Sequence, residues 1–101
     1  MGEGSYKIIW SSEARIDFLN VIDYLLTNWP EKVVNDFIDK VDHKLRVLSA
    51  QPFIGILSEK DPTVRSVLLS KQNRMYYSVS ERTIELLNIF DTRQNPEKNI
   101  Y

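Results

Sequence analysis

The fold of this chain is decided by residues 12–49, which read SEARIDFLNVIDYLLTNWPEKVVNDFIDKVDHKLRVLS. Apolar residues recur there at steps of three and four in two separate runs, the pattern of two amphipathic helices. Pro30 lies between the runs, and proline both disfavours helical geometry at the residue before it and suits the first position of a helix. We therefore predict helices over about residues 12–28 and 30–49, joined by a very tight bend. The two apolar stripes are Ala14, Phe18, Val21, Ile22, Leu25 and Trp29, then Val34, Phe37, Ile38, Val41, Leu45 and Leu48.

The segments on either side of this hairpin have the shorter period of β-strands. Residues 6–10 are apolar and β-prone, and Ser11 and Ser12 after them offer N-cap oxygens to the first helix. From Val64 onwards the apolar period is about two, and strands joined by short turns must be antiparallel. The order β-α-α-β-β-β predicts an α+β fold, with the helical hairpin packed on one face of a small, mainly antiparallel sheet. The last three strands are predicted at Val64–Leu69, Arg74–Val79 and Thr83–Asp91.

Length and composition are those of one domain spanning residues 1–101. Residues 1–4 resemble a flexible tail or a cloning remnant, and residues 95–101, which begin at Asn95-Pro96, are expected to form a mobile C-terminal tail. There is no cysteine, no apolar run long enough to cross a membrane and no signal peptide at the start of the chain. We therefore expect a cytoplasmic protein that does not associate with membranes.

The charge balance argues against a large nucleic-acid footprint. The formal net charge is −1 and the pI is about 5.8, whereas proteins that grip phosphates are usually basic over the binding face. Glu13, Asp17 and Asp23 lie near one helix face, but without His or Cys partners a solvated acidic face is the favoured interpretation. His43 lies opposite the apolar stripe of its helix and is expected to be solvated. No metal or cofactor is expected.

An ordered set of short patterns resembles the RelE/ParE superfamily of toxins from bacterial type II toxin–antitoxin systems. The patterns, which with the element order cover about residues 5–98, are Pro52-x-x-Gly55, Val64-Arg65, Arg74-x-x-Tyr77-x-Val79 and Asp91-Thr92-Arg93. The long hairpin with Trp29-Pro30 at its bend is closer to the ParE branch. The resemblance implies a toxin that arrests growth when free and is neutralised by an antitoxin encoded alongside it. ParE-type toxins act on DNA gyrase, whereas RelE-type toxins enter the ribosomal A site and cut mRNA.

The resemblance carries over only part of a RelE-type nuclease site. Arg65, Arg74 and Arg93 fall where that family has basic catalytic-site residues. A family lysine falls on Val67, and the family's catalytic tyrosine falls near Asn99, with Tyr101 two residues beyond. The incomplete site favours ParE-like inhibition of DNA gyrase over a metal-independent, ribosome-dependent mRNA endonuclease. A third alternative is a degenerate family member that acts only as a protein-binding partner, so whether the chain is an enzyme stays open.

Each arginine also has a structural interpretation. Arg65 could lie on the solvent face of its strand, and Arg74 could be a turn charge or pair with Glu85 across the hairpin. Arg93 is the strongest functional candidate, since it lies at the end of the last strand beside the predicted tail.

Three aromatic or apolar residues are candidates for contact with the antitoxin. Trp29 at the bend could cap the core or anchor another chain, and Leu26 lies off the main stripe. Tyr76 and Tyr77 point to opposite faces of a strand, so at most one is core, and Tyr77 is in phase with the apolar residues. Trp29, Leu26 and Tyr76 are therefore the predicted antitoxin-binding residues.

Overall fold

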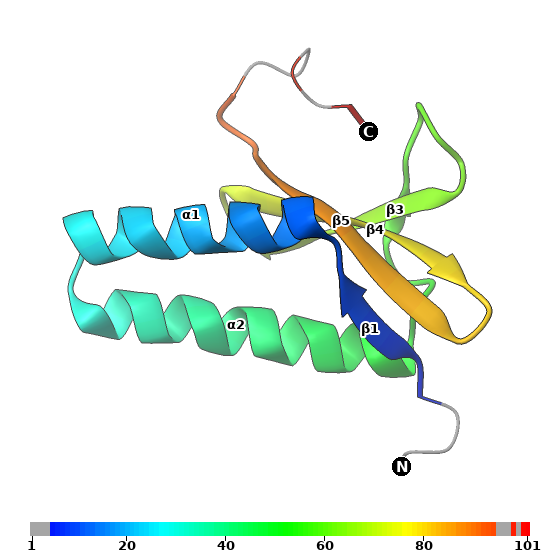
Figure 1. The fold of residues 1–101 in the computed structure, drawn as a ribbon, viewed down its shortest axis with the longest axis horizontal. Helices are drawn as coiled ribbons and strands as arrows, with labels where there is room; N and C mark the ends of the chain where they lie inside the picture. The colour runs from blue at the N-terminus through cyan, green and yellow to red at the C-terminus, as the bar shows by residue number, and fades with distance from the viewer. Residues whose placement is uncertain (1–4, 95–97, 99) are drawn as a thin grey trace.

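The computed structural model describes residues 5–94, 98 and 100–101. Two helices lie side by side against one face of a twisted five-stranded sheet, and the end of the hairpin projects beyond the sheet (Figure 1). The predicted tail at 1–4 lies outside the described residues, as does most of the tail at 95–101. The elements are β1 (Lys7–Trp10), α1 (Ser12–Asn28), α2 (Glu31–Ala50), β2 (Ile56–Leu57), β3 (Val64–Ser70), β4 (Asn73–Ser80) and β5 (Thr83–Asp91).

The predicted α+β architecture is confirmed, with one strand added. The sheet order is β1-β5-β4-β3-β2, in which β1 runs parallel to β5 and the other neighbours are antiparallel. The added strand β2 pairs Ile56 with Ser66 and Leu57 with Arg65. Two residues are too few to show a period of two in the sequence. The strand is therefore recognised only by its pairing with β3. Within the described residues, no helix is long and apolar enough to cross a membrane.

The start of α1 is fixed by Ser11, as its position in the sequence predicts. The Ser11 hydroxyl oxygen accepts a hydrogen bond from the Ala14 amide at 3.0 Å and donates one to the Leu87 carbonyl at 2.9 Å. The first contact satisfies an amide that no helical carbonyl can reach. The second hydrogen bond joins the start of α1 to strand β5.

The tight bend forms at Trp29 and Pro30. Both residues have extended backbones, and Pro30, with φ −61° and ψ 155°, caps α2. The prediction that Pro30 is the first helical residue was therefore wrong by one position, because the proline ring fixes φ but leaves ψ free. The Trp29 amide closes α1 by donating to the Leu25 carbonyl at 2.8 Å. Its side chain is 53% exposed and does not cap the core.

The core lies between the helices and the inner face of the sheet. Met75, Tyr77, Ile84 and Leu86 are completely buried against the helical stripes. Ile38, predicted to be core, is 40% exposed because α2 turns that position away from the sheet. The packing therefore follows most of the predicted apolar stripe on α2 but leaves one edge of it in solvent.

Tyr76 and Tyr77 are both buried, but only Tyr77 belongs to the core cluster, as strand alternation predicted. The register between β4 and β5 shifts at this point, so that Tyr76 pairs with Asn88 and Tyr77 with Leu86. Tyr77 belongs to the core, as predicted, whereas Tyr76 is only 7% exposed and contacts the ring of Tyr101, with centroids 5.6 Å apart. The end of the chain covers Tyr76, and no pattern within β4 predicts this cover.

Candidate functional site

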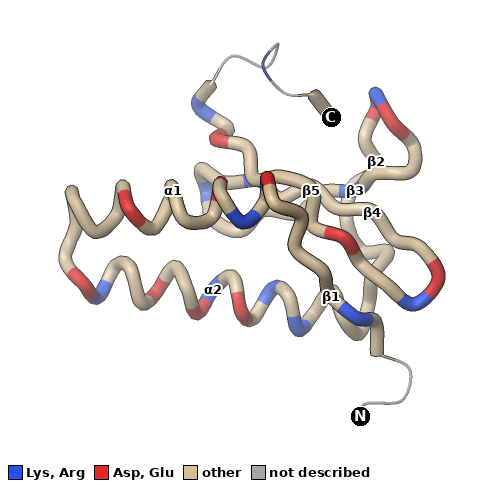
Figure 2. Tube along the Cα trace, viewed as in Figure 1, with Lys and Arg blue, Asp and Glu red and all other residues tan. Residues whose placement is uncertain are grey.

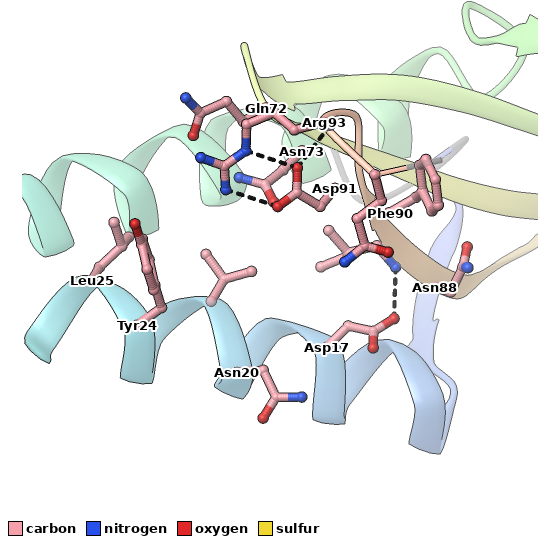
Figure 3. A pocket seen from close by; sticks show the side chains of 13 residues that line it. Asp17, Asn20, Tyr24, Leu25, Gln72, Asn73, Asn88, Phe90, Asp91 and Arg93 are labelled. Atoms are coloured by element: carbon pink, nitrogen blue, oxygen red, sulfur yellow. Dashed lines mark hydrogen bonds and ion pairs between the residues drawn. The ribbon is translucent and has the colours of Figure 1, made fainter. Parts of the chain in front are cut away.

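A cleft of about 500 Å³ separates α1 from the far end of β5 (Figure 3). It forms because β1 pairs with β5 only as far as Trp10 and Leu86, which leaves the edge of β5 beyond that point beside the helix. Asp17 reaches from α1 towards β5, and its carboxylate accepts the Ile89 amide at 2.9 Å. Asp17 is therefore a structural bridge and not the solvated acid that the sequence suggested. Among the described residues, no group of acidic and histidine side chains could hold a metal ion.

Arg93 lies at this cleft, bound to Asp91. Its Nη2 lies 2.8 Å from Asp91 Oδ2 and its Nε 3.0 Å from Oδ1, and its backbone amide also donates to Oδ1. Hydrogen bonds from Arg93 lower the pKa of the Asp91 carboxyl, and Asp91 in turn raises the pKa of Arg93. The Arg93 side chain is still about half exposed. The predicted functional residue is thus held in place by its neighbour and is accessible from solvent.

Arg65 stabilises the loop that follows α2. Its Nη1 donates to the carbonyls of Phe53 at 3.0 Å and Gly55 at 2.9 Å, and its guanidinium lies over the Phe53 ring. Arg65 is partly buried. The alternative of an arginine on the solvent face of its strand is therefore wrong, because the loop folds back over this position.

Tyr77 binds the same loop from the next strand. Its hydroxyl donates to the Pro52 carbonyl at 2.8 Å and accepts the Gly55 amide at 3.0 Å, and burial raises its pKa. A Cβ on Gly55 would collide with the Tyr77 hydroxyl and lie 2.9 Å from the Ser66 carbonyl oxygen. Pro52, Gly55, Arg65 and Tyr77 therefore form one structural unit, which we call the loop clamp.

Arg74 lies on the open face of the sheet, the face that the helices do not cover. Its Nη1 donates to the Ser66 hydroxyl at 2.8 Å. The predicted pairing with Glu85 is wrong, because the register sets Arg74 opposite Phe90 and Glu85 opposite Ser78. Arg74 is two positions from Tyr76, so the two side chains share this open face, where Tyr101 also lies.

The structure does not bring the three arginines together. Arg65 belongs to the loop clamp on the helix side of the sheet, Arg74 lies on the open face and Arg93 lies at the cleft beside α1. Val67, at the position of the family lysine, is packed in the core. His43 is exposed on α2, as predicted, and the charged residues of that helix lie along its length in Figure 2.

The predicted antitoxin contacts divide into two groups. Leu26 and Trp29 are 58% and 53% exposed at the end of the hairpin, whereas Tyr76 is buried beneath Tyr101.

Sequence reasoning missed further exposed apolar residues on α1 and around β2. Two of those on α1, Ile16 and Leu19, are three residues apart on the side of the helix away from the cleft, a signal that was present in the sequence. The missed residues are Ile16, Leu19 and Tyr24 on α1, and Phe53, Ile54, Ile56 and Leu57 around β2.

Comparison with known proteins identifies the family. The family model described as the ParE toxin of the type II toxin–antitoxin system matches residues 8–96. The chain belongs to the ParE toxin family. No curated protein sequence matches it. The resemblance to RelE/ParE toxins is thereby confirmed.

Solved structures of toxins from this superfamily share the fold. A chromosomal ParDE system from P. aeruginosa matches with a TM-score of 0.72 at 18% identity, covering 88% of this chain and 98% of that one. A YoeB/ParE toxin from Agrobacterium tumefaciens matches with a TM-score of 0.63 at 16% identity, covering 84% and 96%. The toxin–antitoxin complex RelBE2 from Mycobacterium tuberculosis matches with a TM-score of 0.59 at 15% identity, covering 86% and 98%. At these identities the similarity establishes the fold.

Proposed function

We propose that this ParE-family toxin arrests bacterial growth by inhibiting DNA gyrase in the cytoplasm. The observation that carries the proposal is the separation of Arg65, Arg74 and Arg93. Cleavage of RNA without a metal needs a base for the 2′-hydroxyl, an acid for the leaving oxygen and a cation at the phosphorane, all at one phosphate. Arginine is a poor base, since its pKa stays above about 12.

Two of the arginines also bind groups within the protein itself. Arg65 donates to two loop carbonyls, and Arg93 is paired with Asp91. Inhibition of gyrase requires only that the toxin bind a protein surface. The exposed apolar residues around β2 and the net charge of −1 are suited to that kind of contact. A protein-binding inhibitor therefore accounts for the site better than a nuclease does.

The proposed neutralising partner is a cognate antitoxin. One similar structure is described as a ParDE system and another as a toxin–antitoxin complex. The end of the hairpin supports an antitoxin contact, because Leu26 and Trp29 expose apolar side chains there. Large aromatic side chains are frequent anchors at protein interfaces. We propose these two residues as antitoxin contacts, and Tyr76 as a contact that requires Tyr101 to move.

The alternative of an mRNA endonuclease is favoured by one observation. Arg74, Tyr76 and Tyr101 share the open face of the sheet, where an arginine and two aromatic rings could receive a phosphate and a base. This arrangement needs neither Arg65 nor Arg93.

The two functions are separated by expressing the toxin from a tightly controlled promoter, with and without the small open reading frame beside its gene. If growth stops, the proposal expects the purified toxin to inhibit gyrase supercoiling in vitro while mRNA 5′ ends stay unchanged. Codon-positioned mRNA cuts that disappear in Arg74→Ala, but persist in the matched control Lys32→Ala, would establish the nuclease instead. Normal growth in both cases would contradict the toxin function in that host and favour the degenerate, binding-only alternative.

A further inference from the structure

The outer face of α1 carries a short, exposed apolar stripe made of Ile16 and Leu19. Ile16 and Leu19 are each 57% exposed, close to the exposed fractions at the end of the hairpin. They lie on the side of the helix opposite Asp17 and Val21, which line the cleft against β5. α1 also carries fewer charged residues than α2 (Figure 2). An amphipathic helix has one apolar face, so this second face needs an explanation.

The charges beside the stripe are arranged symmetrically. Arg15 lies four residues before Leu19 and Asp23 four residues after it, so the three form one ridge along the helix surface. Neither Arg15 nor Asp23 makes an ion pair in the part of the chain that the structure describes, where the ion pairs are on α2 and at Arg93. The ridge therefore presents a positive charge and a negative charge at equal distances from a central leucine.

From this arrangement we infer that the outer face of α1 binds a second copy of the chain. A two-fold axis through Leu19 places two α1 helices antiparallel, with each Leu19 against its own copy. Each step of four residues rises about 6 Å, so Arg15 of one protomer comes level with Asp23 of the other. When the two ridges face each other along their length, each Arg15 meets the Asp23 of the other protomer, so the opposite charges are paired twice. Self-complementarity of this kind is what a two-fold interface requires.

The same ridge is a poor match for most other helices. An unrelated partner would need its own pair of opposite charges at this spacing and in reverse order, which the second copy supplies automatically. The interface is also small, because it involves about three turns of one helix, so we expect a weak dimer in the micromolar range. Leu26 and Trp29 lie outside the ridge, so the inference does not depend on the proposed antitoxin contact.

Charge reversal tests the pairing. In sedimentation equilibrium of the purified free toxin at about 100 µM chain, the wild type should be largely dimeric. Arg15→Asp and Asp23→Arg should each weaken the dimer about tenfold or more, because like charges then face each other. The double variant Arg15→Asp/Asp23→Arg should restore it, since the pairs are re-formed with reversed sign. A monomeric wild type, or a double variant as weak as the single ones, would overturn the inference.

Disulfide cross-linking tests whether the two-fold axis passes through Leu19. Because the chain has no cysteine, an introduced cysteine can pair only with its own copy. Under mild oxidation Leu19→Cys should form a disulfide-linked dimer at protein concentrations where Ile38→Cys, the matched control on α2, stays monomeric. Equal cross-linking of the two variants would mean random collision and would overturn the inference. So would a toxin in which Leu19→Asp loses antitoxin binding and the wild type stays monomeric, since the stripe would then belong to the antitoxin. Circular dichroism of each variant shows whether it is folded.

Discussion

The carboxylate of Asp17 accepts the backbone amide of Ile89 at 2.9 Å, across 72 residues of sequence. The contact joins the second turn of α1 to the part of β5 that β1 does not reach. Without it the Ile89 amide would face the cleft with no strand beside it. The hydrogen bond therefore helps to fix the position of the helix against the sheet and the width of the cleft between them.

Replacing Asp17 should destabilise the fold. Asp17→Ala leaves the part-buried Ile89 amide without its acceptor, which should lower the free energy of unfolding by about 1–3 kcal/mol. Asp17→Asn should lose less, because the amide oxygen can still accept. Urea denaturation followed by circular dichroism measures the change. Asp39→Ala, an exposed position on α2, is the control and should change stability by less than about 0.5 kcal/mol.

Tyr77→Phe should remove both hydrogen bonds that the Tyr77 hydroxyl makes within the loop clamp. The Gly55 amide and the Pro52 carbonyl would then be left unsatisfied, at a cost of about 1–3 kcal/mol at neutral pH. Chemical denaturation compares the two proteins. An unchanged free energy of unfolding would mean that the loop is not held by this hydroxyl.

The buried hydroxyl of Tyr77 also predicts a pH dependence. Burial raises its pKa in the folded state above the usual value for tyrosine, about 10. The stability linked to this group is fully present below the unfolded pKa and is lost as the pH rises through the folded one. The wild type should therefore lose stability in alkaline solution more steeply than Tyr77→Phe. Denaturation curves from about pH 8 to about pH 11 test this, and parallel losses would contradict it.

Gly55→Ala should be destabilising because the added Cβ would collide with the Tyr77 hydroxyl. Overpacking of this kind costs about 1–3 kcal/mol. Thermal unfolding of the single variants and of Gly55→Ala/Tyr77→Phe measures the coupling. The double variant should lose less than the sum of the single losses, since removing the hydroxyl relieves part of the clash. Strict additivity would show that the two residues do not interact.

Arg65→Ala should weaken growth arrest by destabilising the fold and not by removing a catalytic group. It loses the hydrogen bonds to Phe53 and Gly55, and about 1–3 kcal/mol of stability. Growth arrest by the variant should recover at a lower culture temperature, where more of the toxin is folded. Arg46→Ala removes only an exposed ion pair and is the control. A stable Arg65→Ala protein that never arrests growth would indicate a direct role.

Trp29→Ala should weaken antitoxin binding. Loss of a large exposed aromatic anchor costs about 2 kcal/mol in a typical interface, or roughly thirtyfold in affinity. Isothermal titration with the purified antitoxin measures the change, and Leu26→Ala should give a smaller loss. Ile56→Ala, which removes another exposed apolar side chain, on β2, is the control. Equal affinities of Trp29→Ala and the wild type would exclude the end of the hairpin as an antitoxin contact.

Periodicity was sufficient to predict both helices and every strand except β2, because each of these elements carries a local signal. The step of three and four residues predicted both helices, Ser11 marked the first N-terminus and Pro30 marked the bend. Turn residues separated the last three strands. These signals depend on backbone sterics and on the direction of neighbouring side chains, and both act within a few residues. β2 was missed because its two residues carry no period of their own.

The surroundings of each candidate residue were decided only by tertiary structure. One interpretation of Arg65 was a solvent-facing arginine, but the loop at Gly55, ten positions earlier in the sequence, folds over it. Tyr76 was expected to be exposed, but the last residue of the chain covers it. In the sequence Asp17 resembles a surface acid, but in the fold it accepts a hydrogen bond from the Ile89 amide of β5. Burial and hydrogen bonding depend on which distant segments meet, and a residue's own neighbours in sequence carry no record of that.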